Sequence, residues 1–361
     1  MAKDFHVFIG TKGEVIKMAP VMRELQARNI EYNFINSGQH NVTTKHLIED
    51  FQLKQPDIIL DNRSNDVANL RQGLAAIIKN VSKSPFKKKN IFKGKKGITL
   101  LIGDTNTTIQ GLIISKLAGI ETCHIEAGER TYRMFEPFPE EIVRRIVNRY
   151  SEYLFPLSEQ GHKNLLNEKA KGKIYPIKYN TVLDSVRLAL KSKPRMEIPK
   201  GKYVVATCHR LETIFSKERF TKVIDILERI SKDEHVIYVT QPSAKVRLRE
   251  YGLLSRVENN PNITMKPLYD YISFMNLINK SKYIVTDGGG PQEESAFMNK
   301  PCLLLRNTSE RLWYTNVFIS ELKDEKVEYF LNNIDQFKRK ELEDKDYSPA
   351  REIVDILEKL E

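Results

Sequence analysis

Polar side chains that could do chemistry directly follow short apolar runs at four places in the sequence. They are Asp104 after ITLLIG, Glu126 at the end of ETCHIEA, His209 after KYVVATC and Asp287 after KYIVT. In open α/β sheets, ligands bind outside the carboxyl ends of the strands, so these positions predict a ligand site. Two of them have a structural alternative, since Asp104 could cap the next helix and His209 could be a satisfied edge histidine.

The segment that follows KYIVT, with the sequence DGGGPQEE, carries the clearest physical signal. Gly288, Gly289 and Gly290 allow the backbone to approach a bulky anion closely. Pro291 is predicted to begin the next helix, whose N-terminal amides could hold phosphate. Glu294, one turn further, could accept hydrogen bonds from a ribose. The alternative is a tight strand-to-helix turn, because the segment is neither a GxGxxG fingerprint nor a Walker loop.

Carboxylates at element boundaries are the second signal. Asp104, Glu126 and Glu140 all lie at such boundaries in the first half of the chain. A group of acids in a low-dielectric cleft is one way to raise a pKa toward general acid or base work. Their charge could be balanced by Lys17, Arg130 and Arg144. The alternative for Glu140 is simple stabilisation of a helix N-terminus.

The elements that must position these residues alternate from end to end, with short apolar runs separated by amphipathic stretches. This pattern is typical of parallel sheets flanked by helices. In the first half, the predicted strands are 5–10, 30–36, 98–103, 121–127 and 153–156, and the predicted helices are 15–28, 107–118 and one from Pro139. After a pause, the predicted strands are 202–208, 235–240, 262–266, 282–286 and 302–305, and the predicted helices are 220–231, 271–279 and 291–298.

This alternation predicts an α/β fold with two domains, and 361 residues are enough for two cores. We place the domains at 1–175 and 176–345. The terminal stretch 347–360 is amphipathic and could pack on either of them.

Metal and nucleophile chemistry is not expected. His40, His46, His124 and His209 show no metal-ligand spacing with cysteine or with each other. The sequence also has no nucleophile elbow for Ser-His-Asp chemistry.

The net charge of +11 is uneven along the chain, because seven lysines and no acid lie between Lys83 and Lys96. The rest of the chain carries only +4. We interpret this run as a solvated loop rather than a nucleic-acid or lipid surface, since it lacks arginine and has few base-stacking aromatics. No nucleic-acid partner is expected.

The compartment is predicted to be the cytoplasm. No apolar run approaches the length that spans a bilayer, so we expect no stable membrane insertion, and the start MAKDFHVFIG has no signal segment. Cys123, Cys208 and Cys302 have no paired spacing and are predicted to be buried thiols.

Seven segments, in order along the chain, resemble the signature segments of the UDP-N-acetylglucosamine 2-epimerase family. They are GTKGEVIKMAP at 10–20, GDTNTT at 103–108, IEAGERT at 125–131, FPEEIVRR at 138–145, TCHRLET at 207–213, TDGGGPQEE at 286–294 and RNTSER at 306–311. The resemblance covers most of the chain. It implies a glycosyltransferase-B-like fold, in which two Rossmann-like domains face each other across a nucleotide-sugar cleft and a last helix, about 346–361, returns to the first domain. It also implies a homodimer.

The resemblance assigns roles by position. The catalytic groups fall on Asp104, Glu126, Glu140 and His209. The substrate-binding positions are Lys12, Lys17, Arg144, Gly288, Gly289, Gly290, Glu294 and Arg311. The implied reaction removes the proton at C2 of a UDP-2-acetamido sugar as UDP departs from C1, and UDP then returns to the 2-acetamidoglucal to give the 2-epimer. It needs no cofactor or metal, and its product serves surface polysaccharide or glycan synthesis.

Several positions depart from the family pattern. Lys12-Gly13 replaces Arg-Pro, Gly288 replaces a serine, and Gln241-Pro242-Ser243 replaces a His-containing segment. Because parts of that segment form an activating UDP-GlcNAc site in the bacterial enzymes, we do not expect such a site here. The resemblance favours the non-hydrolysing reaction, while release of free ManNAc, a modified sugar, and a glycosyltransferase or nucleotide-sugar binder stay open.

Overall fold

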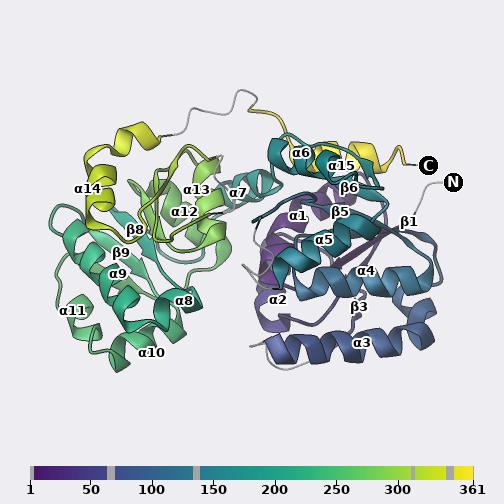
Figure 1. Cartoon of the computed structure of the whole chain (residues 1–361), viewed down its shortest axis with the longest axis horizontal. Helices are drawn as coiled ribbons and strands as arrows, with labels where there is room; N and C mark the ends of the chain where they lie inside the picture. The colour runs from purple at the N-terminus through teal and green to yellow at the C-terminus, as the bar shows by residue number, and fades with distance from the viewer. Residues whose placement is uncertain (1–3, 63–69, 133–138, 310–313, 339–344, 361) are drawn as a thin grey trace. The chain divides into compact units, whose positions relative to one another are not determined.

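The structure is a computed structural model that describes residues 4–62, 70–132, 139–309, 314–338 and 345–360 (Figure 1). The chain forms two compact units. Unit 1 comprises Met1–Ser185 with Asp346–Glu361, and unit 2 comprises Val186–Lys345. The division lies within α7 (Val182–Lys191), whereas the sequence analysis places it near residue 175.

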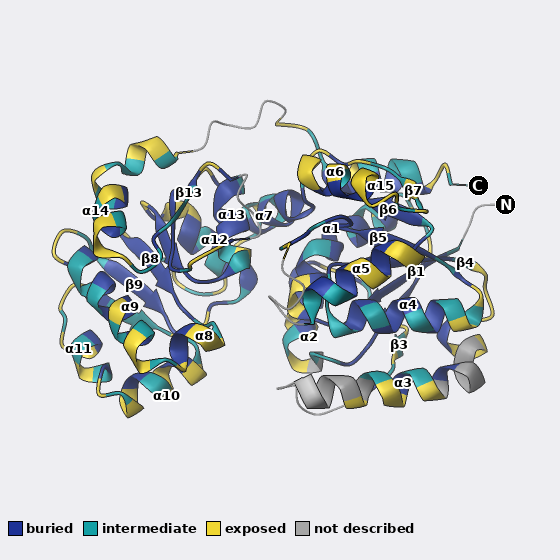
Figure 2. Cartoon of the chain, in the orientation of Figure 1, coloured by how far each residue is buried: buried dark blue, intermediate teal, exposed yellow. Residues whose placement is uncertain are grey.

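Unit 1 contains a seven-stranded sheet in the order β3-β2-β1-β4-β5-β6-β7, in which every neighbouring pair is parallel. Its strands are β1 (Asp4–Ile9), β2 (Tyr32–Asn36), β3 (Ile58–Ile59), β4 (Gly97–Ile102), β5 (Glu121–Ile125), β6 (Tyr153–Phe155) and β7 (Lys173–Ile174). The central strands are almost wholly buried, as expected for a parallel sheet with helices on both faces (Figure 2).

The helices of unit 1 follow its strands in turn. They are α1 (Lys12–Ala27), α2 (Asn41–Asp50), α3 (Leu70–Ile91), α4 (Asn106–Ala118), α5 (Glu140–Tyr150), α6 (Glu159–Asn167), the start of α7, and α15 (Pro349–Leu357). Helix α4 lies between α3 and α5 over an apolar cluster that includes Phe8, Leu101 and Leu112. Helix α15 packs against α1, so the end of the chain completes unit 1 (Figure 1).

Unit 2 repeats the plan with a six-stranded parallel sheet in the order β10-β9-β8-β11-β12-β13. Its strands are β8 (Val204–Thr207), β9 (Val236–Val239), β10 (Ile263–Lys266), β11 (Ile284–Thr286), β12 (Cys302–Leu304) and β13 (Val317–Ile319). Its further helices are α8 (Leu211–Ile214), α9 (Lys217–Ile230), α10 (Pro242–Glu250), α11 (Leu254–Glu258), α12 (Tyr271–Lys280), α13 (Gly289–Phe297), α14 (Asp324–Asn332) and the 3-10 helix η1 (Ile334–Phe337). The predicted α/β fold with two Rossmann-like sheets is confirmed.

The lysine-rich stretch between Lys83 and Lys96 is not the loop that its composition predicts. Helix α3 continues through it as far as Ile91, and the chain turns only after that residue. Lysine is a good helix former, and the burial of Ile91 and Phe92 fixes the end of the helix against the core. The run is therefore mainly a helix with a short turn after it.

Four helices, α1, α4, α9 and α13, begin one to three residues earlier than predicted, and local contacts explain two of them. Helix α1 begins at Lys12 because Thr11 and Glu14 form a capping box, in which the Thr11 side chain accepts from the Glu14 amide at 3.3 Å. Helix α13 begins at Gly289, so Pro291 is its third residue rather than its first. Proline is tolerated there because the first turn needs no amide hydrogen from it.

None of the helices in the described part of the chain is long and apolar enough to cross a membrane.

Candidate active site

The first group of predicted site residues lies at the carboxyl edge of the unit 1 sheet. Strands β4 and β5 are paired so that Ile102 lies opposite Ile125. Glu126 follows Ile125 directly and Asp104 follows Ile102 after Gly103, so the pairing brings both acids out of the sheet at neighbouring places. Glu140 is the first residue of α5, whose middle contacts α4.

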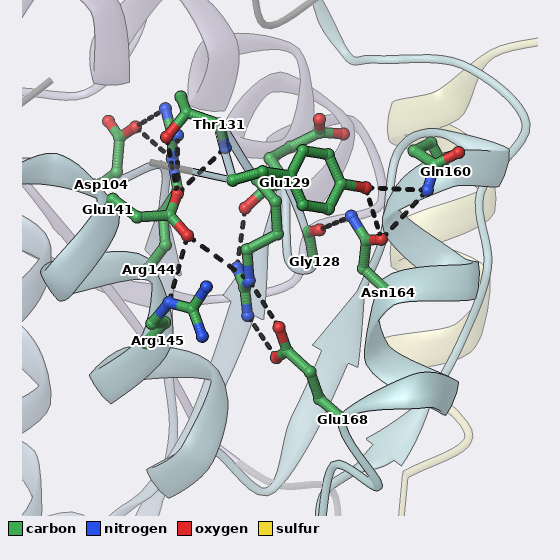
Figure 3. Close-up of polar contacts among 12 residues, drawn as sticks. Asp104, Gly128, Glu129, Thr131, Glu141, Arg144, Arg145, Gln160, Asn164 and Glu168 are labelled. Carbon is green, nitrogen blue, oxygen red and sulfur yellow. Dashed lines mark hydrogen bonds and ion pairs between the residues drawn. The ribbon is translucent and has the colours of Figure 1, made fainter. Parts of the chain in front are cut away.

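Asp104 is held by a guanidinium. Arg144 donates to Asp104 Oδ2 from Nε at 2.7 Å and from Nη2 at 2.5 Å (Figure 3). Burial alone would lower the pKa of Arg144, but the charge and hydrogen bond of Asp104 act together with the charges of Glu126 and Glu141 to raise the pKa. The alternative role of Asp104 as a helix cap is wrong, because the Thr105 hydroxyl caps α4 and accepts from the Thr107 amide at 3.0 Å.

Glu126 is held from both sides. The Lys17 ammonium, from α1, forms an ion pair with Oε2, and Asn180 Nδ2 donates to Oε1 at 3.1 Å. Glu126 is 7 % exposed and its backbone is in the left-handed region with φ 69°. A non-glycine residue in that region costs energy, and such strain is concentrated at functional sites.

Glu141, the residue after Glu140 in α5, is a buried acid that binds the guanidinium groups of two arginines. Glu141 is completely buried and accepts from the Thr131 amide at 3.1 Å, Arg145 Nε at 3.2 Å and Arg144 Nη1 at 3.4 Å (Figure 3). Arg130, which was expected to balance the catalytic acids, instead donates to Glu168 from Nε at 2.7 Å. Of the three cations named from the sequence, Lys17 and Arg144 contact the predicted acids.

His124 supports the backbone that carries Asp104. Its ring is buried, with Nε2 2.7 Å from the Gly103 carbonyl oxygen and Nδ1 2.6 Å from Asn148 Oδ1. Burial lowers the pKa of His124. Sequence reasoning considered this histidine only as a metal ligand, and the structure gives it a role in the sheet edge instead.

The second group lies at the carboxyl edge of the unit 2 sheet. Thr207 at the end of β8 is paired with Thr286 at the end of β11, and His209 and Asp287 follow them. The Asp287 carboxylate is completely buried and accepts from the His209 amide at 3.0 Å and the Arg210 amide at 3.1 Å. His209 is therefore fixed through its backbone, while a third of its side chain is exposed.

The glycine segment packs directly beside His209. A Cβ atom at Gly288, which precedes α13, would lie 2.7 Å from His209 Cε1, so only glycine fits there without a shift. A Cβ atom at Gly290 would lie 4.0 Å from the carboxylate of Glu294, which is 6 % exposed. Burial, and then the charge of Glu294, raises the pKa of Tyr271 well above its ordinary value.

The predicted phosphate-binding segment Gly288–Gly290 lies at the start of α13. The first turn of an α-helix leaves its amides without intrahelical acceptors and carries the positive end of the dipole. Helix α13 has nine residues and begins with Gly289 and Gly290, after Gly288. Such a helix N-terminus suits a phosphate group.

Lys12 and Arg311 are the last two predicted substrate-binding residues. Lys12 is exposed at the first position of α1. Arg311 lies outside the described residues.

The lysine run contributes to the opposite edge of the unit 1 sheet. Lys93 pairs with Asp57 at 2.6 Å and Lys95 with Asp4 at 2.9 Å, beside a hollow of about 460 Å³ near the amino ends of β1 and β2. These lysines are thus engaged in ion pairs away from the predicted site. Among the side chains that the structure describes, no group of three or more His, Cys, Asp or Glu could hold a metal ion.

Comparison with known sequences identifies one family. The family model described as UDP-N-acetylglucosamine 2-epimerase matches residues 23–356. The UDP-N-acetylglucosamine 2-epimerase of Methanococcus maripaludis is 31 % identical over 343 aligned residues, covering 91 % of this chain and 90 % of that protein.

Solved structures show the same architecture. Methanocaldococcus jannaschii UDP-GlcNAc 2-epimerase in complex with UDP-GlcNAc and UDP matches with a TM-score of 0.79 and 26 % identity, covering 98 % of this chain and 99 % of that one. A UDP-glucosyltransferase from Polygonum tinctorium matches with a TM-score of 0.60 and 12 % identity, covering 99 % and 98 %, and shares the fold alone.

Proposed function

Since this chain belongs to the UDP-N-acetylglucosamine 2-epimerase family and is an isomerase, we propose that it inverts C2 of UDP-GlcNAc to give UDP-ManNAc. The observation that carries the proposal is the pair of cation-bound carboxylates at adjacent strand ends. Asp104 is bound by Arg144 and Glu126 by Lys17. The chemistry at C2 needs carboxylates held in fixed positions beside a polyanion.

The proposed reaction is an anti elimination followed by re-addition. A carboxylate takes the C2 proton, the electron pair of the C2–H bond forms the C1=C2 bond, and the C1–O bond breaks as UDP leaves. UDP then adds back to C1 of the 2-acetamidoglucal while a proton is delivered to the opposite face of C2. Asp104, Glu126, Glu140 and His209 supply the acid and base groups in this proposal.

Arg144 and Lys17 serve two purposes in this scheme. They offset the negative charge of two of the acids, so that a diphosphate is not repelled. They also fix the carboxylates at their strand ends, and positioning of this kind accounts for a large part of the rate of an acid–base reaction.

UDP is proposed to bind mainly through unit 2. The first turn of α13 at Gly288–Gly290 holds the diphosphate, and Glu294 accepts hydrogen bonds from the ribose. Lys12 and Arg311 add positive charge. The proposal requires that both units act on the same substrate molecule.

Incubation with UDP-GlcNAc in heavy water, followed by proton NMR, tests this function. We expect UDP-ManNAc to accumulate with deuterium at C2. Protium retained at C2 of a turned-over product would contradict the elimination mechanism. Free ManNAc with UDP would show the hydrolysing reaction, and a requirement for an acceptor would show a glycosyltransferase.

The roles of the four catalytic groups are tested by single substitutions. Asp104→Asn, Glu126→Gln, Glu140→Gln and His209→Ala should each lower kcat by well over about tenfold, as the loss of a general acid or base does. Glu31→Gln is the matched control, because Glu31 is 94 % exposed at the other edge of the unit 1 sheet. Near-normal turnover in all four variants would refute the assignment.

We also propose that the enzyme is a cytoplasmic homodimer. The three cysteines are buried free thiols, which suits a reducing compartment.

The proposed subunit interface lies on the contacting helices α3, α4 and α5. These helices carry exposed apolar side chains at Ile78, Leu117 and Ile146. Light scattering should give twice the chain mass of 41.9 kDa, and Leu117→Glu should lower it.

A further inference from the structure

Asn180 connects the start of α7 to the carboxylate of Glu126. It is 6 % exposed, and its Oδ1 accepts from the Val182 amide at 3.1 Å, which is an Asx turn at the first residue of the helix. A backbone amide only donates, so the atom that accepts from it is the amide oxygen. The remaining atom is therefore the NH₂ group, and it donates to Glu126 Oε1 at 3.1 Å.

The two oxygens of Glu126 thus have different partners. Lys17 binds Oε2 and Asn180 binds Oε1. Among the described residues, the charged and titratable groups that act on this carboxylate include Lys17 from α1, Arg144 from α5 and His124 from β5. Asn180 is the neutral member of the set, so it fixes the plane of the carboxylate without adding charge.

We propose that Asn180 is a positioning residue for the C2 chemistry, which orients the Glu126 carboxylate from the first turn of α7. This inference rests on the catalytic role proposed for Glu126. A carboxylate bound at both oxygens keeps one orientation toward its substrate, and loss of the Asn180 partner removes one of the bonds that hold that orientation. Neither helix propensity nor strand pattern points to Asn180, because its partner is 54 residues away in sequence.

Three substitutions separate positioning from helix stability. Asn180→Asp keeps an oxygen for the Val182 amide but places a second carboxylate against Glu126. Asn180→Ser keeps a hydroxyl for the turn and removes the NH₂ group. Asn180→Ala removes both.

We expect Asn180→Ser to melt near the wild type, because the turn keeps its acceptor. We expect Asn180→Ala to melt lower through loss of the turn and Asn180→Asp to melt lower through like-charge repulsion with Glu126. All three should lower kcat, by roughly tenfold or more, with KM for UDP-GlcNAc within about twofold of the wild type. In Asn180→Asp, the acid limb of the pH–rate profile should move up by roughly one pH unit, because a like charge favours the protonated form of its neighbour. If Asn180→Asp keeps the wild-type kcat and pH profile, or if kcat follows the melting temperature alone, the inference is wrong.

A direct titration keeps this test independent of turnover. Glutamate labelled with ¹³C at the side-chain carboxyl gives the Glu126 signal as the one lost in Glu126→Gln. Its midpoint should be higher in Asn180→Asp than in the wild type, and an unchanged midpoint overturns the contact. An inactive wild type with a shifted midpoint would refute the proposed function and not the contact. An active wild type with active Glu126→Gln would refute the role of Glu126.

Discussion

His6 is a buried histidine on the central strand of unit 1, away from the proposed site. It is completely buried, stands edge-on to Phe92 with ring centroids 5.0 Å apart, and contacts Asn33 Nδ2 through Nδ1 at 3.2 Å. Burial lowers the pKa of His6 from 6.5 to about 4, with smaller effects from nearby charges. The ring is thus neutral in the folded protein at neutral pH.

This burial predicts a pH-dependent stability. The unfolded chain takes up a proton at His6 near pH 6.5, whereas the folded chain does so only near pH 4. The free energy of unfolding is therefore highest, as far as His6 determines it, above pH 6.5. It falls by up to about 3 kcal/mol as the pH drops toward 4. Urea unfolding across this range should show the loss, and His6→Gln should flatten it. The control His46→Gln, on the exposed face of α2, should keep the wild-type slope.

The sequence predicts the site residues that follow strands and also Lys17 and Arg144, which hold two of them, but it misses other partners. Asp104, Glu126 and His209 stand out because each comes directly after an apolar run. Asn180 and Glu141 do not, because their roles depend on partners from other segments. One signal for Glu141 is available in the sequence. Glu140 and Glu141 are adjacent at the start of α5, and one of two adjacent glutamates can point into the core.

At the scale of elements, the residues just before α13 pack against the residues that follow β8. Strands β8 and β11 are neighbours, and Asp287 binds the amides of His209 and Arg210. Gly288 then leaves room for the His209 ring. The turn proposed to bind phosphate and the histidine proposed to be catalytic are therefore positioned together.

Two alanine substitutions should separate these roles. Gly288→Ala places a methyl group 2.7 Å from His209 Cε1, so the ring must move and kcat should fall by roughly tenfold or more. Gly290→Ala has only the Glu294 carboxylate within 4.0 Å, so it should mainly raise KM by crowding UDP. Steady-state kinetics checks this. Equal effects on kcat and KM in both variants would contradict it.

Most sheet strands are predictable because their apolar runs are short and end in turn residues. β1, β4 and β9 are examples. The edge strands β3 and β7 are not, since two residues carry no period, and the edge strand β13 is not predicted either. The end of helix α3, from Lys83 to Ile91, is predicted to be a loop because proline and repeated lysines resemble a loop in composition, and tertiary packing overrides that local signal.

At the scale of the whole molecule, unit 1 is built from two separate parts of the chain. Helix α15 buries Pro349, Ala350, Ile353, Val354 and Leu357. Asp184 Oδ2 accepts from the Ala350 amide at 2.9 Å and from the Ser348 hydroxyl at 3.0 Å, which fixes the start of α15. The packing of α15 on α1 makes the last helix part of the unit 1 core.

Ile353→Ala should therefore destabilise unit 1 selectively. Ile353 is completely buried, and removing such a side chain costs about 2–5 kcal/mol. Hydrogen exchange should speed up for the amides of α1 and β1 while those of β8 and β9 keep their protection. Lys359→Ala, at an exposed position after the same helix, is the control. Equal loss of protection in both units would show that they unfold together.

The return of α15 also sets an order on biosynthesis. A ribosome makes all of unit 2 before it makes the residues that cover α1. An N-terminal domain usually folds to completion while the rest of the chain is still being translated. Unit 1 cannot do so, because α15 is part of it. Until α15 emerges, α1 keeps an uncovered apolar face, so the nascent chain is exposed to aggregation throughout the synthesis of unit 2.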